Sequence, residues 1–537
     1  MYTKLLDNIA TEIVRAFEAA TDQTISVTEA RGSLSFCDIE FGDFASNIAL
    51  VMAKQLKQPP RDIAQRLADE LARADSIENV EVAGPGFVNL RLSDGVWAEL
   101  FAALQPDFFQ TDTGTGKSVN VEFISANPTG PLVLVNAWGG YYGDVLASLY
   151  ESQGYRVSRE YYLNDGGNQI RQLGKAVQQA AGAQFSEEES AVLYRGDYVD
   201  RLAKQIGSEL GSAQALIEAD AQMIGDRAKV QILDEYIRPT LQTLGIHHDV
   251  IYPETTLDNQ ITLDRLQAIG AVKEADGAIW LDAERAGLDK DEVLVRSTDH
   301  EETYFLKDIS YQLTKLEDRK FDLAITIVGP DHHGQEQRLL AALRLLGANG
   351  FVPLWTQTVR LTKDGKEYKM SKRRGNYIVL DDFLELVPSD TARFFFALRD
   401  TNSHFDLDLD LVSAQNKHNP LYYVMYAYVR AGSVLAKAGS YQKPSTYTFD
   451  DTQKYMLRGF LLEAELIRQA TENYQVHPVL YQMIELARSF HDWYDRNPIA
   501  NEQDSQLRAQ RLAFVEAYRQ AVHSLFTLIG IQPLEKM

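Results

Sequence analysis

The sequence predicts a doubly wound parallel α/β sheet, with a small α+β unit before it and an all-α unit after it. In the middle of the chain, strand-like, loop and helix-like segments alternate. The first hundred residues mix helical apolar spacing with strand-like alternation, whereas the pattern after about Ser413 is almost wholly helical. Strand–loop–helix units in series are typical of parallel sheets that bind ligands at the carboxyl ends of their strands.

The N-terminal α+β unit is expected to occupy residues 1–110. Helical spacing is found at residues 1–20, 45–56 and 61–74. Residues 80–92 alternate like two strands around Gly84-Pro85-Gly86. The Gly- and Thr-rich stretch at 110–118 then marks a boundary, so we expect the sheet domain at 111–412 and the helical domain at 413–537.

The sheet domain is predicted from six segments that alternate in type. Strands are expected at 119–125, 156–162 and 323–328, and helices at 136–153, 167–181 and 335–346. Residues 405–411 alternate acidic and apolar side chains, which indicates one further, half-buried strand.

Composition excludes several classes of protein. The 537 residues are 45% hydrophobic and 24% charged, which is ordinary for a soluble globular protein, and no apolar run is long enough to span a bilayer. A single cysteine, Cys37, rules out a disulfide framework and a multi-cysteine zinc site. With a net charge of −23, any nucleic-acid contact has to use a local basic surface. These features favour a cytoplasmic protein.

One short segment runs against this acidic background. Between Lys363 and Arg374 there are six basic residues and two acidic ones, and residues 369–374 read Lys-Met-Ser-Lys-Arg-Arg. Two lysines three residues apart, followed by Gly375 and Asn376, suit a loop that closes on a polyphosphate. A solvated surface loop is the alternative, since short basic runs are usually that.

Three other segments carry candidate chemistry. Residues 125–132 (Ser-Ala-Asn-Pro-Thr-Gly-Pro-Leu) follow a strand and precede a helix, so their N–H groups can face an anion or a carboxylate. Residues 329–334 (Gly-Pro-Asp-His-His-Gly) follow another strand and suit a nucleotide; a metal site is not expected, because adjacent acid and histidine side chains cannot easily face one ion. Asp308 is expected at a helix start, where the helix dipole alone would favour an acid.

Together these motifs resemble bacterial arginyl-tRNA synthetase, a class I aminoacyl-tRNA synthetase. The resemblance rests on 125–132, 159–170 (Arg-Glu-Tyr-Tyr-Leu-Asn-Asp-Gly-Gly-Asn-Gln-Ile), 304–309 (Tyr-Phe-Leu-Lys-Asp-Ile), 329–334 and 369–373. Residues 41–49 and 84–90 are similar to its N-terminal tRNA-binding domain, and 406–410, 419–427 and 528–537 to its helical anticodon-binding domain. The likeness covers essentially the whole chain and implies a Rossmann-like class I catalytic domain.

The resemblance implies a two-step reaction. The carboxylate of L-arginine attacks the α-phosphate of ATP, and the resulting adenylate esterifies an arginine-accepting tRNA, with AMP and pyrophosphate released. ATP is expected to enter with Mg²⁺ as a substrate complex, without a prosthetic group or a dedicated metal site. A monomer that does not bind membranes is expected.

The resemblance also implies roles for individual residues. The catalytic set is Lys369, Met370, Ser371, Lys372 and Asn136, of which the two lysines and Ser371 would stabilise the departing pyrophosphate. The ATP set is Pro128, Gly130, Gly139, Gly329, Asp331, His332, Met370 and Lys372. The arginine set is Ser125 and Asn127 for the α-groups, and Glu254, Tyr304 and Asp308 for the side chain. For Glu254 a plain surface acid is the alternative, because Pro253 replaces the family's usual serine before it.

The chain departs from the family at residues 133–138. The family commonly reads His-x-Gly-His there, but this chain reads Val-Leu-Val-Asn-Ala-Trp. Asn136 can replace the second histidine as a donor, whereas Val133 cannot hydrogen-bond a phosphate and Val135 adds bulk where the family has glycine. The alternative function is therefore a non-catalytic tRNA-binding paralogue with impaired use of ATP.

Overall fold

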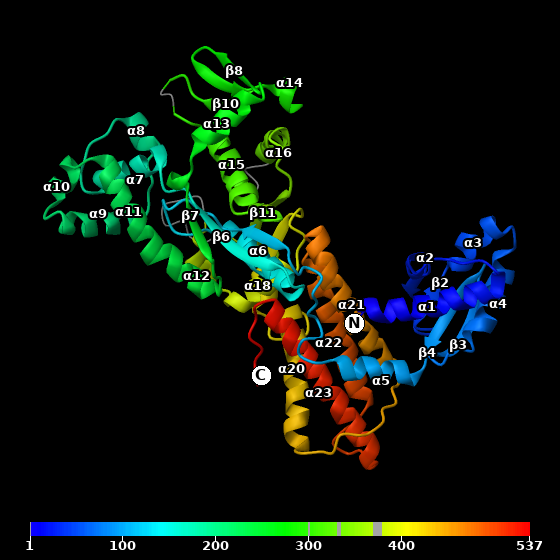
Figure 1. The fold of residues 1–537 in the computed structure, drawn as a ribbon. Helices are drawn as coiled ribbons and strands as arrows, with labels where there is room; N and C mark the ends of the chain where they lie inside the picture. The colour runs from blue at the N-terminus through cyan, green and yellow to red at the C-terminus, as the bar shows by residue number, and fades with distance from the viewer. Residues whose placement is uncertain (1, 299–300, 330–333, 369–377) are drawn as a thin grey trace.

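The N-terminal unit is built on a four-stranded antiparallel sheet in the order β1-β2-β4-β3 (Figure 1). The structure, a computed structural model, describes residues 2–298, 301–329, 334–368 and 378–537. The elements of this unit are α1 (Tyr2–Thr21), α2 (Val27–Gly32), β1 (Leu34–Phe36), β2 (Phe44–Ser46), α3 (Ile48–Leu56), α4 (Pro60–Leu71), β3 (Ile77–Ala83), β4 (Phe87–Leu92) and α5 (Asp94–Ala103).

The sequence predicted α1, α3, α4 and the strand pair β3 and β4, but not α2, β1, β2 or α5, and it placed the start of α3 too early. The predicted helix at 45–56 begins only at Ile48, because Ala45 pairs with Ser35 and Asn89 inside the sheet. Helical spacing cannot distinguish three buried residues of a central strand from the first turn of a helix.

The catalytic sheet has five parallel strands in the order β12-β11-β5-β6-β7. Its strands are β5 (Ser118–Glu122), β6 (Arg156–Leu163), β7 (Val250–Pro253), β11 (Leu323–Val328) and β12 (Phe351–Trp355). From β5 the chain runs outward through β6 to β7 and returns to β11 on the other side of β5. The strand order therefore reverses between β5 and β11, where doubly wound sheets bind their ligands. The predicted fold class is confirmed.

Helix α6 (Leu134–Ser152) follows β5 and packs closely on the sheet. A Cβ atom added at Gly143 would lie 2.5 Å from the ring of Phe123, so only glycine permits this approach of the helix to the strand end. Helix α7 (Gly167–Ala180) follows β6, and α16 (Gln335–Leu345) follows β11. Both lie where the sequence predicted helices.

Two excursions interrupt the strand–helix alternation, and the sequence analysis did not predict either. After α7, a helical group contains α8 (Glu187–Ala191), α9 (Asp197–Glu209), α10 (Ala213–Glu218), α11 (Ala221–Ile232), η1 (Leu233–Ile237) and α12 (Arg238–Leu244). After β7 come η2 (Glu254–Thr256), α13 (Asn259–Ala268), the small antiparallel sheet β8 (Val272–Ala275), β9 (Ala278–Leu281) and β10 (Glu292–Val295), with α14 (Ala283–Ala286). α15 (Tyr304–Leu313) and η3 (Thr314–Asp318), a π-helical turn, then lead back to the sheet. Figure 1 shows the small sheet projecting from the catalytic domain.

A third small sheet, in the order β14-β13-β15, follows β12. It contains β13 (Val359–Lys363), β14 (Lys366–Glu367) and β15 (Phe405–Asp408), and the nearby helices are α17 (Leu380–Leu384), α18 (Ser389–Ala397) and α19 (Leu409–Ser413). The predicted strand at 405–411 thus ends at Asp408, whose side chain accepts hydrogen bonds from the N–H groups of Asp410 and Leu411 and caps α19.

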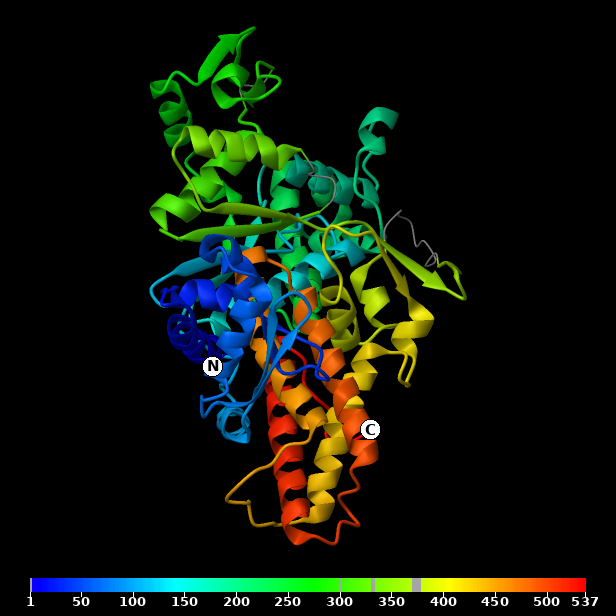
Figure 2. The same cartoon turned by 90° about the vertical axis from the view of Figure 1, so that its right-hand side faces the viewer.

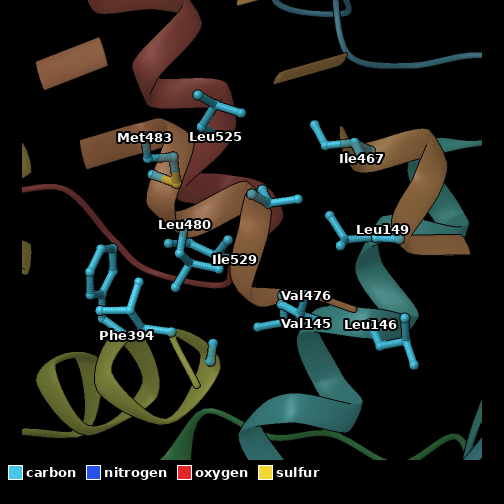
Figure 3. Packing of buried hydrophobic residues seen from close by; sticks show 14 of the residues in the cluster. Val145, Leu146, Leu149, Phe394, Ile467, Val476, Leu480, Met483, Leu525 and Ile529 are labelled. Carbon is cyan, nitrogen blue, oxygen red and sulfur yellow. The ribbon is translucent and has the colours of Figure 1, made fainter. Parts of the chain in front are cut away.

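Four long helices form the C-terminal unit: α20 (Pro420–Ala438), α21 (Asp451–Asn473), α22 (His477–Arg496) and α23 (Ser505–Leu528) (Figure 2). Its hydrophobic core continues into the catalytic domain, where residues of α6 and α18 meet those of α21 to α23. Figure 3 shows Val145, Leu146, Leu149, Phe394, Ile467, Val476, Leu480, Met483, Leu525 and Ile529 in this junction. Among the described helices, none is long and apolar enough to cross a bilayer.

Candidate active site

The carboxyl edge of the parallel sheet gathers the predicted arginine-binding residues. Ser125 follows β5, Glu254 directly follows β7, and Gly329 follows β11. Tyr162, one residue before the end of β6, lies between the first two. Four adjacent parallel strands therefore bring residues 37 to 204 positions apart in the sequence to one edge.

The loop after β5 has a strained backbone. Ile124 and Ser125 are consecutive non-glycine residues with positive φ angles, 71° and 35°. Such conformations cost on the order of 1–3 kcal/mol each and persist only where surrounding contacts enforce them. Here the Ser125 hydroxyl donates to Glu122 Oε1 (2.9 Å) and accepts from the Tyr162 N–H (3.0 Å). These bonds fix the orientation of the Ser125 side chain.

Glu254 is a buried carboxylate and not a surface acid. Only 5% of the residue is exposed, which excludes the alternative that the sequence left open. Its Oε1 atom accepts from Lys307 Nζ at 2.7 Å, and its Oε2 atom accepts from the Tyr162 hydroxyl at 3.1 Å. One oxygen thus faces a cation from α15 and the other a neutral donor from β6.

Asp308 lies in the second turn of α15, which corrects the prediction that it begins a helix. The N-cap of α15 is Thr303, whose hydroxyl accepts from the Leu306 N–H. The helix dipole therefore does not explain the acid at position 308, since the effect of the dipole is confined to the first turn. Burial raises the pKa of Tyr162, and the Glu254 and Asp308 carboxylates raise it further. Both carboxylates therefore act on the same hydroxyl group.

A cavity of about 490 Å³ opens at Lys307, the partner of Glu254. Its lining includes Tyr304 and Lys307 from α15, Glu302 before that helix, Gln172 from α7 and Arg338 from α16. Tyr304 is 51% exposed, as a side chain that lines an accessible pocket should be. Of the predicted arginine-binding set, Tyr304 is the member that lines this cavity.

Beneath the edge, the sheet buries a layer of charges. Lys315 Nζ lies 2.6 Å from Glu122 Oε2, which also accepts from the Thr326 hydroxyl at 2.9 Å. The Lys315 side chain is fully buried, and that of Glu122 is 6% exposed. Glu122 therefore joins β5 to η3 and β11 through one oxygen, and positions Ser125 through the other.

A second buried carboxylate, Glu160 on β6, is held in the same layer. It accepts from Tyr311 (2.5 Å), Asn120 (2.9 Å) and the guanidinium of Arg319. Burial alone would raise the pKa of Glu160, but the Arg319 hydrogen bonds, the Lys315 charge and the Tyr311 hydroxyl together outweigh burial and lower it. Glu160 is thus a fixed anion.

The first residues of α6 lie next to residues 378–380. The N–H of Leu134 donates to the Ile378 carbonyl (3.0 Å), and the N–H of Leu380 donates to the Leu132 carbonyl (2.9 Å). Asn136 Oδ1 accepts from the Val133 N–H at 2.8 Å, so the amide of Asn136 is oriented by the helix start itself. The chain that follows the basic segment therefore contacts the start of α6 at Ile378 and Leu380.

Other predicted ATP-binding residues have distinct local surroundings. Pro128 is buried, and Gly130 is half-buried beside the hydroxyl of Tyr198. Gly139 faces Ile327, where an added Cβ would lie at 3.4 Å, so Gly139 has a packing role against β11. Asn127, from the arginine set, is exposed.

Several predicted residues lie outside the described part of the chain. These are Lys369, Met370, Ser371, Lys372, Asp331 and His332. Among the described residues, no group of three or more His, Cys, Asp or Glu side chains is arranged to hold a metal ion.

Sequence reasoning missed Tyr162, Lys307 and the buried charge layer. Tyr162 and Lys307 lie inside segments that carried the family resemblance, but neither had been given a role. The signal for the charge layer was Asn120 and Glu122, two polar residues in a strand that is buried throughout. Polar side chains in such a strand require partners, which this structure supplies from Glu160 on β6 for Asn120 and from Lys315 in η3 and Thr326 on β11 for Glu122.

Three family models match successive parts of the chain. The arginyl tRNA synthetase N-terminal domain matches residues 4–92, the catalytic domain of class I (R) tRNA synthetases matches 100–393, and the DALR anticodon-binding domain matches 424–537.

Comparison of the whole chain with individual proteins points to the same family. An arginine–tRNA ligase from Oleidesulfovibrio alaskensis is 35% identical over 526 residues, covering 93% of this chain and 94% of its own. One from Symbiobacterium thermophilum is 34% identical over 572 residues, covering 99% and 100%. The structure of Thermus thermophilus arginyl-tRNA synthetase aligns over 99% of both chains with a TM-score of 0.75 at 22% identity, which shows a shared fold.

Proposed function

The chain belongs to the arginyl-tRNA synthetase family and ligates arginine to tRNA, and we propose that it activates arginine at the carboxyl edge of the five-stranded sheet. The matches to curated ligases favour this activity over a non-catalytic tRNA-binding paralogue. The observation that carries the location is the buried Glu254 carboxylate, at the strand end next to Ser125 and Tyr162.

The guanidinium of arginine binds between Glu254 and Asp308, with Tyr304 on the cavity side. A planar guanidinium matches carboxylate oxygens with two parallel hydrogen bonds, which an ammonium group cannot do. The geometry at Glu254 supports this role because the Tyr162 hydroxyl holds the carboxylate in a fixed orientation. Low exposure strengthens such a charge-assisted bond.

The α-ammonium and α-carboxylate of arginine bind at Ser125 and Asn127. The Ser125 hydrogen already goes to Glu122, so its remaining lone pair is the group that can accept from an α-ammonium. Because Glu122 takes the hydroxyl hydrogen, Ser125 is left as a hydrogen-bond acceptor for arginine. Asn127 is exposed at the same loop and can donate to the α-carboxylate.

ATP binds across the reversal of strand order, between the loops after β5 and β11. Pro128, Gly130, Gly139, Gly329, Asp331 and His332 contribute to that site. Asn136 donates from its amide nitrogen, because its oxygen is occupied by the Val133 N–H. Lys369, Ser371 and Lys372, beside Met370, stabilise the pyrophosphate as it leaves.

Further parts of the proposal concern the whole protein. Mg²⁺ enters with ATP as part of the substrate. The chain divides at residues 110 and 412 into tRNA-binding, catalytic and anticodon-binding domains. It acts as a cytoplasmic monomer and does not bind membranes.

ATP–pyrophosphate exchange with arginine, with and without arginine-accepting tRNA, tests the proposal. Glu254→Gln and Asp308→Asn should each raise KM for arginine about 100-fold, since each removes a charge-assisted contact, and leave KM for ATP unchanged. Asn136→Ala should lower kcat by about 10²-fold with little change in KM for arginine. Wild-type protein that binds tRNA but shows no exchange in either condition would overturn the activity.

A further inference from the structure

Lys307 occupies the carboxylate to which the arginine side chain is assigned. Its ammonium lies 2.7 Å from Glu254 Oε1 and is the cation that this structure pairs with Glu254. We propose that Lys307 is an internal competitor for the substrate side chain: arginine binds by displacing the Lys307 ammonium from Glu254. The inference rests on the proposed role of Glu254 in arginine binding.

The two partners differ in their freedom to move. The Glu254 side chain is 4% exposed, fixed by Tyr162 and located at the rigid end of β7. The Lys307 side chain is 20% exposed and has four rotatable bonds. If the pair opens, Glu254 therefore stays buried and needs another cation, whereas Lys307 can turn toward solvent.

The cavity supplies a second position for Lys307. Its ammonium already lies 5.6 Å from the centre of the Tyr304 ring, within the range of a cation–π contact. Glu302 lines the same cavity, and its Oε2 atom accepts from Asn259 at 2.7 Å. A lysine displaced from Glu254 thus moves into a space lined by an aromatic face and a carboxylate.

The exchange favours arginine because of the geometry of the two cations. A lysine ligand offers Glu254 an ammonium, the group that Lys307 already provides, so replacing one by the other gains no new contact. An arginine ligand replaces a point charge by a planar fork that can bond Glu254 and Asp308 together. Lys307 competes with either cation and therefore lowers the affinity for both amino acids.

Two substitutions at this position should act in opposite directions. Lys307→Met leaves Glu254 without its internal cation, so KM for arginine and the inhibition constant of L-lysine should each fall about fivefold. Lys307→Arg places a guanidinium on Glu254, so KM for arginine should rise about tenfold with kcat nearly unchanged. The readout is tRNA-dependent ATP–pyrophosphate exchange at varied arginine, with L-lysine as a competing ligand.

Lys175→Met is the matched control, because Lys175 pairs with Glu189 at 2.9 Å and does not line the cavity. This variant should change neither KM for arginine nor the inhibition constant of L-lysine. A purely structural ion pair predicts instead that Lys307→Met raises KM or changes stability alone, and that Lys307→Arg, which keeps the pair, leaves KM unchanged; either result overturns the proposal. If Lys307→Met does not fold, Lys307→Arg decides alone. Unchanged KM in Glu254→Gln would show that the proposed arginine site itself is wrong.

Discussion

Glu160 in the catalytic sheet and Glu463 in the helical domain are both fully buried, but their surroundings are opposite. Glu160 accepts from Tyr311, Asn120 and Arg319. Within the part of the chain that the structure describes, neither oxygen of Glu463 has a hydrogen-bond partner. Burial raises the pKa of Glu463 well above its ordinary value, whereas the pKa of Glu160 is lowered.

The opposite surroundings of Glu160 and Glu463 show two different roles for a buried acid. A paired carboxylate in the sheet stays ionised and fixes polar groups that support the site above it, as Glu122 does for Ser125. A lone carboxylate in a helix bundle favours its protonated form, because burial raises its pKa, and behaves as a poorly matched core residue. The sheet therefore depends on its buried charged groups, whereas the helix bundle is stable in spite of one buried acid.

The strongest test of this comparison is Lys315→Met. The substitution leaves Glu122 buried without its cation, which typically costs about 3–5 kcal/mol of unfolding free energy. Urea denaturation should show the loss. Ser125 also loses part of its support, so KM for arginine should rise in exchange assays.

The double variant Lys315→Met, Glu122→Gln is the control. It removes both charges and should recover part of the lost stability, because no unpaired ion remains. Equal stability of the single and double variants would mean that charge pairing is not what the sheet requires.

Local pattern predicted three of the five strands of this sheet, but not β7, β12 or the charge layer. The strand at 323–328 and the helices after β5, β6 and β11 are found within two residues of their predicted limits, because apolar periodicity is a local property. Lys315 and Glu122 are 193 residues apart, and no local signal couples them. The same holds for Lys307 and Glu254, whose partnership depends on how α15 packs beside β7.

Tyr311→Phe tests whether donors keep Glu160 ionised. Losing a hydrogen bond to a charged group costs about 1.5–3 kcal/mol. A carboxyl with a lowered pKa stabilises the fold above its unfolded pKa, about 4.3, and that stability disappears as pH falls through the folded value. The variant should therefore begin acid unfolding at a higher pH than the wild type, as followed by circular dichroism. An unchanged acid transition would show that the Tyr311 hydroxyl does not help to keep Glu160 ionised.

Glu463→Met tests the other side of the comparison and should stabilise the protein. A carboxyl with a raised pKa favours the fold at low pH, and this contribution is lost as pH rises and the unfolded chain ionises. The gain from the variant should thus be larger at pH 8, on the order of 1–2 kcal/mol, than at pH 5. A gain that does not depend on pH would indicate better packing and not a buried acid.

The smallest effect is expected for Arg360→Met. Arg360 and Asp406 pair across β13 and β15 at 2.7 Å, but both side chains are largely exposed, 65% and 48%. Solvent and salt screen such a pair, and ordering two long side chains offsets most of the attraction. The urea midpoint should stay within error of the wild type, at low and at high salt. A shift comparable to that of Lys315→Met would show that the position of a charge in this protein matters less than its having a partner.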